Sequence, residues 1–259
     1  MKLTVLGGSA AGPNPGQGCS GYLVESGTTR IVLDLGSGTF PELRRHADFQ
    51  LLDGVVLSHG HLDHFLDVLT LRYALAYNPI PAERPLPLWL PPSGPALLDR
   101  LAQAITDDSD TEEFLSVFEV NQFDPDALLR IKDLEIRFFP TVHYVPCWAM
   151  RVANGVDGDL FYTADTGPAA NLSTAAAGSH IVIAEGTDRG GSREPYSSRG
   201  HMTPAEAGTL ARDAGAGVLV LSHLWVEDDP FQAVREASQM FGGPVELATP
   251  GLRINWQSE

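Results

Sequence analysis

The chain has few of the features that mark secreted or membrane-bound proteins. Its 259 residues include only two cysteines, Cys19 and Cys147, which cannot form a disulfide framework. We therefore expect a reducing cytoplasm and interpret both thiols as small buried side chains. No apolar run approaches the roughly 18 residues that a membrane helix needs. The opening segment MKLTVLGG has too short an apolar stretch for a signal peptide and predicts a first strand.

Basic residues are also scarce. Lysine and arginine number 17 against 33 acidic residues, which gives a formal net charge of −16. Such a surface repels polyanions, so we do not expect a polynucleotide partner. A small phosphate-bearing substrate remains compatible, because bound divalent cations would reverse the sign of the field locally.

The chain has no internal repeat and no low-complexity linker, and we predict a single domain over residues 1–259. Short apolar runs typical of strands alternate with helical patterns at 64–77, 94–105 and 203–214. The proline-rich segment 79–95 is interpreted as a connector whose alternation permits a short edge strand. This order of elements predicts an α/β sandwich with sheets inside and helices outside.

What the chain does contain is a dense polar motif, LSHGHLDH, at residues 57–64. Its chemistry lies in His59, His61, Asp63 and His64. A strand-like run precedes the motif and a helical pattern follows it, so its side chains can converge in a strand-to-helix loop. Neutral imidazoles and a carboxylate suit Zn, Mn or Fe. The alternative is an exposed polar loop without a ligand, which this density of histidines disfavours.

Three further polar residues lie at the ends of strand-like runs. His143 ends LEIRFFPTVH, Asp165 ends LFYTAD and His223 ends VLVLSH. Singly, each has an ordinary explanation as a satisfied core histidine or a turn cap. Their common position at strand ends, in a chain that already has the loop motif, favours one shared metal site.

With His59-Gly-His61-Leu-Asp63-His64 followed by His143, Asp165 and His223, the chain resembles the metallo-β-lactamase-fold hydrolase superfamily. The resemblance spans nearly the whole chain, because Asp34 in VLDLGSG and the opening LTVLGGSAAG also match. The motif set is specific for the fold and the metal site and weak for the substrate. It implies a four-layer αββα sandwich with the metals at one edge of the sheets.

The resemblance also implies two divalent metal ions, zinc with manganese or iron as alternatives. Each ion would have three ligands of its own: His59, His61 and His143 for one, and Asp63, His64 and His223 for the other. Asp165 would bridge the two ions together with a water or hydroxide. Asp34 would orient the ligands without binding a metal, or it is an ordinary turn residue at the end of a strand. An acidic bridge and a histidine at position 61 favour hydrolysis, of the phosphodiesterase or glyoxalase II-like kind, over redox chemistry.

We expect Asp63, His201 and Glu185 to be the catalytic residues. A hydroxide held by two cations can attack the substrate, but the leaving group still needs a proton donor. His201, after the loop 186–200, is the candidate, with Glu185 holding its tautomer and its proton. Ribonuclease Z-like phosphodiesterases have a similar Glu and His-x-Thr arrangement, here Glu185 and His201-Met202-Thr203. The alternative is a loop histidine and a strand-capping glutamate.

The short interval from His143 to Asp165 lacks the glycine- and proline-rich arm with which ribonuclease Z enzymes grip tRNA. The expected substrate is therefore a small phosphodiester such as a cyclic nucleotide. A thioester or lactone hydrolase with the same dinuclear site is the alternative enzyme, and a metal- or nucleotide-binding module without turnover is the non-enzymatic one.

Several other residues have a functional and an ordinary interpretation. Arginines of the loop 186–200 could meet a phosphate or could be solvated charges; they are Arg189, Arg193 and Arg199. Aromatic residues near the motifs could stack on a base or could be core and rim side chains; they are Tyr144, Trp148 and Trp225. The apolar helix 64–77 and the proline segment after it could be a homodimer face or could pack internally.

Overall fold

The structure is a computed structural model that describes residues 1–106 and 111–257. Within these residues the strands form two sheets. The first has the order β14-β1-β2-β3-β4-β5-β6 and the second the order β13-β12-β11-β10-β9-β8-β7. The first sheet consists of β1 (Lys2–Gly7), β2 (Gly21–Ser26), β3 (Thr29–Leu35), β4 (Gly54–Val56), β5 (Leu86–Leu90), β6 (Phe118–Gln122) and β14 (Arg253–Asn255). The second consists of β7 (Leu129–Ile131), β8 (Leu134–Pro140), β9 (Trp148–Ala153), β10 (Leu160–Tyr162), β11 (Ile181–Glu185), β12 (Val218–Ser222) and β13 (Val245–Leu247).

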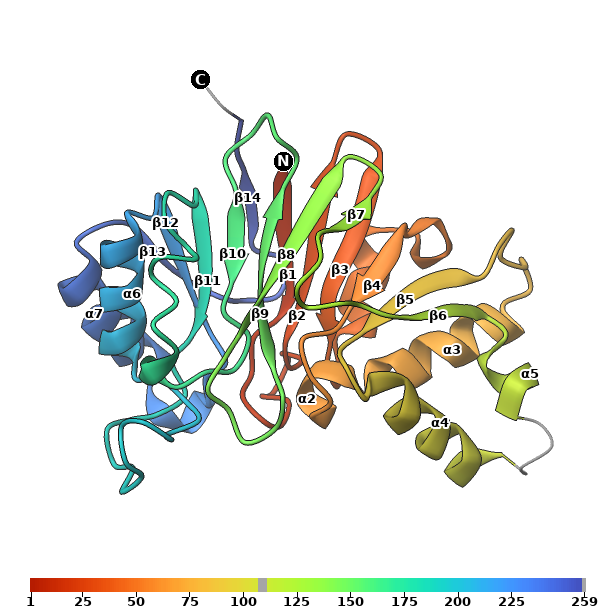
Figure 1. The fold of residues 1–259 in the computed structure, drawn as a ribbon, viewed down its shortest axis with the longest axis horizontal. Helices are drawn as coiled ribbons and strands as arrows, with labels where there is room; N and C mark the ends of the chain where they lie inside the picture. The colour runs from red at the N-terminus through yellow and green to blue at the C-terminus, as the bar shows by residue number, and fades with distance from the viewer. Residues whose placement is uncertain (107–110, 258–259) are drawn as a thin grey trace.

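Helices cover the outer face of each sheet, as Figure 1 shows with α6 and α7 on one side and α3 and α4 on the other. The helices beside the first sheet are α1 (Phe40–His46), α2 (Leu62–Phe65), α3 (Asp67–Tyr77), α4 (Gly94–Ile105) and α5 (Thr111–Leu115). Those beside the second are α6 (Pro204–Ala214) and α7 (Pro230–Phe241). The predicted four-layer αββα sandwich is therefore confirmed.

The core follows from the two-residue period of the strands. On β3, Ile31 and Leu33 face the apolar layer between the sheets, whereas Val32 faces the layer under the helices. Ile136 and Ile181 meet the same central layer from the second sheet. The sheets therefore pack face to face, and the ends of their strands open along a common edge.

The proline-rich segment departs from its prediction, because β5 lies inside the first sheet between β4 and β6 and not at its edge. Pro87 is tolerated there because β4 pairs only with Leu88 and Trp89, so the part of β5 that contains Pro87 has β6 as its single neighbour. In this segment the alternation of apolar residues, which permits a strand, was a better guide than the proline content, which suggested a connector.

The helices at 94–105 and 203–214 lie where the sequence patterns predict them. Thr203 caps α6 in a reciprocal capping box with Glu206, and Pro204 is the first helical residue. The pattern at 64–77 is divided into α2 and α3 with Leu66 between them. Among the described residues, no helix has the length and apolar character that crossing a membrane requires.

Candidate metal centre

The motif 57–64 leaves β4 and enters α2, and a buried carboxylate holds this turn from behind. The backbone N–H of Ser58 and its hydroxyl both donate to Asp34, at 2.7 Å each. His61 precedes α2 in an extended conformation, and the His64 N–H donates to its carbonyl oxygen at 3.0 Å. The turn therefore presents two histidines before the helix and the rest of the motif on its first turn.

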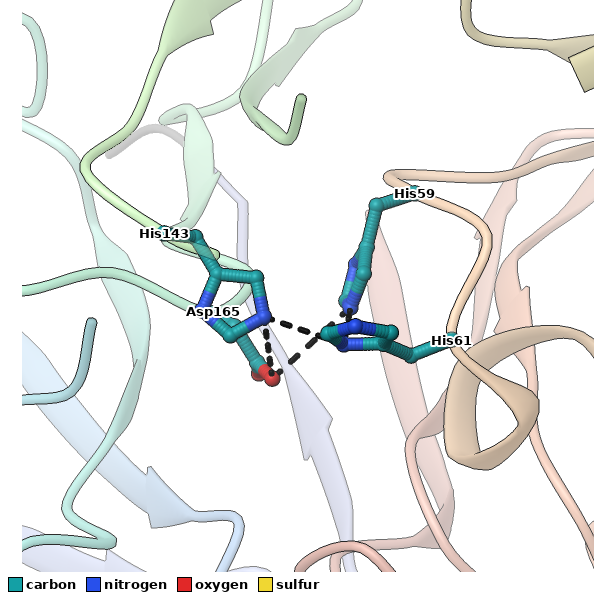
Figure 2. Close-up of side chains that lie close together, drawn as sticks. All are labelled: His59, His61, His143 and Asp165. Atoms are coloured by element: carbon teal, nitrogen blue, oxygen red, sulfur yellow. Dashed lines mark hydrogen bonds and ion pairs between the residues drawn. The ribbon is translucent and has the colours of Figure 1, made fainter. Parts of the chain in front are cut away.

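One cluster consists of His59, His61, His143 and Asp165, which point toward one another from the two sheets in Figure 2. The Nδ1 atom of His61 lies 3.1 Å from His59 Nε2 and 3.0 Å from His143 Nε2. Asp165 Oδ2 lies 3.8 Å from His59 Nε2 and 3.6 Å from His143 Nε2. Tetrahedral ligands about 2.0–2.1 Å from zinc lie about 3.3 Å apart, so these spacings fit one cation.

A second cluster consists of Asp63, His64, Asp165 and His223. The Nε2 atom of His223 lies 3.0 Å from Asp63 Oδ2 and 3.3 Å from His64 Nε2. Asp165 contributes its other oxygen here, because Oδ1 lies 3.2 Å from His64 Nε2 and 3.5 Å from His223 Nε2. These spacings fit a second cation.

Asp165 is shared by the two clusters, with one carboxylate oxygen directed to each. Its side chain is buried, and Oδ1 makes no hydrogen bond of acceptable geometry. A buried acceptor without a donor is costly, by about 1–3 kcal/mol, and more when it is charged. Among neutral imidazoles this carboxylate lacks a donor, and a divalent cation in each cluster would satisfy it.

The ring orientations leave lone pairs facing the clusters. Four histidines have Nδ1 against an acceptor: His59 against Ser58 Oγ at 2.9 Å, His64 against Asp34 Oδ2 at 2.7 Å, His143 against the Gly200 carbonyl at 3.0 Å, and His223 against Thr187 Oγ1 at 2.6 Å. The Thr187 hydroxyl donates to the His223 carbonyl oxygen, so it accepts from the ring. With Nδ1–H donated outward, Nε2 of each ring is free to bind a metal. His61 differs in presenting Nδ1.

Burial keeps most of these imidazoles neutral. It lowers the pKa of His59, His61 and His143, and the neutral form is the one that binds metals. Burial opposes ionisation of Asp63, but the hydrogen bond with His223 and the charge of His64 lower its pKa to about 2. The clusters thus combine neutral nitrogen donors with ionised oxygen donors.

The carboxylates around His64 favour its protonated form. Burial disfavours its protonated form, but the carboxylates of Asp165 and Asp34 raise its pKa well above the usual value. Burial likewise disfavours ionised Asp165, yet His223 and His64 lower its pKa well below the usual value. A proton on His64 therefore occupies the electrostatic position that a cation would take.

Backbone strain is concentrated beside the clusters. Asp34, Ala164 and His223 have φ values of 55°, 49° and 58°. Non-glycine residues at positive φ cost of the order of 1–3 kcal/mol each and persist only where the surroundings fix them. This strain aims Asp34 and His223 into the site and turns the chain at Ala164, immediately before Asp165.

The predicted pair of His201 and Glu185 is formed. His201 Nδ1 lies 2.9 Å from Glu185 Oε1, which also accepts the Thr166 N–H at 2.7 Å. The His201 ring lies 5.0 Å from that of His143 and 5.7 Å from that of His223. Although burial favours neutral His201, the Glu185 carboxylate raises its pKa to about 9.

The arginines of the loop 186–200 are mostly engaged. Arg199 forms ion pairs with Asp188 at 3.2 Å and with Glu206. Arg189 pairs with an acidic residue on α7 at 3.5 Å. Arg193 has no ion pair with any residue that the structure describes. Arg189 and Arg199 therefore hold the loop through ion pairs within the protein and are not free to meet a phosphate.

The three aromatic residues considered as stacking partners, Tyr144, Trp148 and Trp225, lie in different places. Trp148 packs against the core between the sheets. Trp225 lies at the surface, 37% exposed. Tyr144 is 56% exposed, and its ring lies 5.1 Å from that of His143 and 5.7 Å from that of His201. Of the three, Tyr144 is placed at the rim of the clusters.

Sequence reasoning missed several residues that hold the site. Tyr162 donates to Asp34 Oδ2 at 2.7 Å, and a tyrosine in a buried apolar strand does need such a partner. Its position three residues before Asp165 could have suggested this role. Thr187 and the Gly200 carbonyl, which orient His223 and His143, have no comparable signal in the sequence.

The two sheets, their outer helices and the histidine and aspartate clusters at the strand ends together define a metallo-β-lactamase-fold protein. Residues 29–224 match the family described as "Beta-lactamase superfamily domain". The chain belongs to this superfamily and is a metallo-hydrolase within it. Membership implies divalent metal ions, and the donor atoms of the clusters are suited to them.

The relatives agree with this assignment. The chain is 31% identical over 265 residues to "Probable metallo-hydrolase YhfI" of Bacillus subtilis (strain 168), covering 97% of this chain and 98% of that protein. The crystal structure of YhfI matches with a TM-score of 0.85 at 29% identity, over 98% of each chain. "Ribonuclease Z" of Myxococcus xanthus (strain DK1622) is 24% identical over 305 residues, 98% of this chain and 97% of that protein. A diphosphatase from the PhnP family shares the fold, with a TM-score of 0.71 at 17% identity over 100% and 99% of the two chains.

Proposed function

We propose that the protein is a phosphodiesterase that hydrolyses a small phosphodiester, such as a cyclic nucleotide, with two divalent metal ions. One observation carries the proposal: Asp165 directs one oxygen to each of two complete donor clusters. The ligands would be His59, His61 and His143 for one ion and Asp63, His64 and His223 for the other, with Asp165 bridging. Zinc suits these nitrogen and oxygen donors, as do manganese and iron.

Bound cations would supply an activated water and would neutralise charge on the phosphoryl oxygens. The chain's own residues position that chemistry. Asp34, Ser58, Thr187 and the Gly200 carbonyl fix the rings so that their lone pairs face the clusters. Asp63, whose Oδ2 lies 3.0 Å from His223 Nε2, would orient the water, because its carboxylate is the one oxygen donor in the second cluster beside the bridge.

His201 would protonate the leaving oxygen. Its Nδ1 is committed to Glu185, so Nε2 remains to donate toward the substrate, at the side of the clusters formed by His143 and His223. Glu185 is fixed in turn by the Thr166 and Thr187 N–H groups, at 2.7 Å and 3.2 Å. An acid held in this way stabilises a leaving alkoxide in the transition state.

This acid favours an oxygen ester over a thioester. A thiolate, with a conjugate acid of pKa about 8.5, leaves without a proton donor far more readily than an alkoxide. The similarity to a ribonuclease Z, whose name denotes a nuclease, further supports a phosphodiester. The net charge of −16 favours a small substrate over a polynucleotide. Lactone hydrolysis, which also expels an alkoxide, is the second candidate.

A substrate panel on protein of measured metal content tests the proposal. Bis(p-nitrophenyl) phosphate, cyclic AMP, S-lactoylglutathione and an acyl lactone are compared at equal enzyme concentration, with Asp165→Asn as the control for contaminating activity. We expect turnover of the phosphodiesters and its loss in Asp165→Asn. Faster turnover of the thioester or the lactone would replace the proposal with those activities. Reconstituted protein that binds metal but turns over none of the four would indicate a binding module.

A further inference from the structure

A pocket of about 290 Å³ adjoins the first cluster beside His61. Three segments of chain form it: the metal loop at Gly60 and His61, the turn 91–94 with the start of α4, and the loop after His143 at Val145 and Pro146. The pocket thus lies between elements of both sheets. We call it the ring pocket.

The ring pocket is bordered by the first cluster and not by the proposed acid. His61 lines it and His201 does not. The ring of His143 contacts both, with centroids 4.9 Å from that of His61 and 5.0 Å from that of His201. Because His61 belongs both to the first cluster and to the pocket wall, a group that stays on a phosphorus held at the clusters can enter the ring pocket.

The walls of the ring pocket are apolar, and no carboxylate of a described residue lines it. Pro91, Pro92 and Pro146 present flat hydrocarbon surfaces, and Leu97 forms the wall from α4. Arg100 adds a positive charge. In a chain with a net charge of −16, this combination suits an apolar group carried by an anion.

The wall is fixed relative to the metal loop. A side chain at Gly60 would collide with Leu97 Cδ2, so Leu97 packs directly on the loop that carries His61. The volume also limits the occupant. A cavity of about 150 Å³ holds benzene, so about 290 Å³ has room for a substituted aromatic ring.

We propose that the ring pocket binds an aromatic ring on the substrate, attached through the part of the phosphodiester that is not expelled. The ring would be an aryl ester group or, in a cyclic nucleotide, the base. The proposal rests on the phosphodiesterase function and adds the substituent that the enzyme selects. Leu97 and Val145 are then specificity-determining residues.

The test compares two substrates with the same leaving group. Bis(p-nitrophenyl) phosphate retains an aryl group after hydrolysis, whereas methyl p-nitrophenyl phosphate retains a methyl group. In Leu97→Trp, which fills the ring pocket, the ratio of their kcat/KM values is expected to shift about tenfold or more toward the methyl ester. Val145→Trp fills the pocket from the opposite wall and should shift it likewise. Gln103→Trp, at an exposed position of α4 that does not line the pocket, is the matched control.

A binding measurement supports the kinetics without turnover. Calorimetry on the same variants compares phenylphosphonate with methylphosphonate, and the preference for the phenyl compound should fall in Leu97→Trp and not in Gln103→Trp. Cyclic AMP shows whether the ring pocket binds a nucleotide base or only an aryl ester group. If the base occupies the pocket, the kcat/KM for cyclic AMP falls in the tryptophan variants together with that for the diaryl ester. Suppose that Leu97→Trp and Val145→Trp retain their metal and still show the wild-type ratio of kcat/KM values for the two diesters. That result overturns the proposed role of the ring pocket and leaves the phosphodiesterase function standing. Wild-type protein that is loaded with metal and cleaves neither diester overturns the phosphodiesterase function, and the ring pocket with it.

Discussion

Replacing His201 by alanine should separate substrates by the basicity of their leaving groups. The ring holds Glu185 at 2.9 Å through Nδ1 and lies beside the rings of His143 and His223, so its free nitrogen is positioned for a leaving oxygen. A positioned general acid contributes roughly 10²–10⁴-fold when the leaving group is a poor one. A p-nitrophenolate leaves without protonation, so its esters should lose only a few fold by comparison.

The assay measures kcat for His201→Ala and the wild type on a series of aryl and alkyl phosphodiesters. The dependence of log kcat on leaving-group pKa should become steeper in the variant, because the proton no longer stabilises the developing alkoxide. Metal content of each preparation is the control. Equal losses across the series would show that His201 has a structural role and no role as an acid.

The pH dependence gives a second check with a definite sign. The Glu185 carboxylate raises the pKa of His201 to about 9, so the acid form is present below that pH and is lost as the pH rises through it. Bound dications nearby would lower this value, so the alkaline limb is expected below about pH 9. Glu185→Gln removes the charge and should move the limb to lower pH. An alkaline limb that Glu185→Gln does not move would contradict the pairing.

Three further predictions concern the clusters. Asp34→Asn places an amide where four donors converge and should weaken metal binding about 10–100-fold, as measured by competition with a chromophoric chelator. Metal uptake at neutral pH should release about one proton from His64, whose pKa is raised in the metal-free state, so calorimetric enthalpies should vary with the ionisation enthalpy of the buffer. Gly36→Ala, whose methyl group would overlap the carbonyl oxygen of Asp63, should lower the metal content and the melting temperature, whereas Gly191→Ala, in open space, should change neither.

Each of these has a contrary outcome. Unchanged metal affinity in Asp34→Asn would mean that the carboxylate does not orient the ligands. Enthalpies independent of the buffer would mean that the metal-free site holds no displaceable proton. Equal behaviour of the two alanine variants would mean that the contact between Gly36 and the metal loop does not position Asp63.

The strand-end pattern predicted much of the site, because β8, β10 and β12 run in the same direction and the side chains that follow them meet at one edge of the second sheet. His59, His143, Asp165 and His223 follow strands of two sheets that face each other, and the structure brings them together. The assignment of the single domain over residues 1–259 stays a prediction. The position of β5 inside the first sheet was missed, because the order of strands depends on pairing between segments distant in sequence.

The groups that select the metal-binding lone pairs could not be predicted in the same way. The Gly200 carbonyl orients His143, which is distant in the sequence, and Thr187 likewise orients His223. A carbonyl or a threonine carries no mark of such a role, and its effect depends on the path of the loop 186–200. Arg199 holds that path through its ion pairs with Asp188 and Glu206.

Arg189 and Arg199 form ion pairs within the protein, so in the proposed function these two arginines would not supply the charge that binds an anionic substrate. Arg199 is used to hold the loop, and the loop provides the acceptor for His143 and carries His201 at its end. The positive charge that meets the substrate would come from the cations themselves, and the protein's contribution is the orientation of their ligands. A change of loop 186–200 should therefore alter metal geometry and proton donation together, whereas a change in the ring pocket alters the choice of substrate alone.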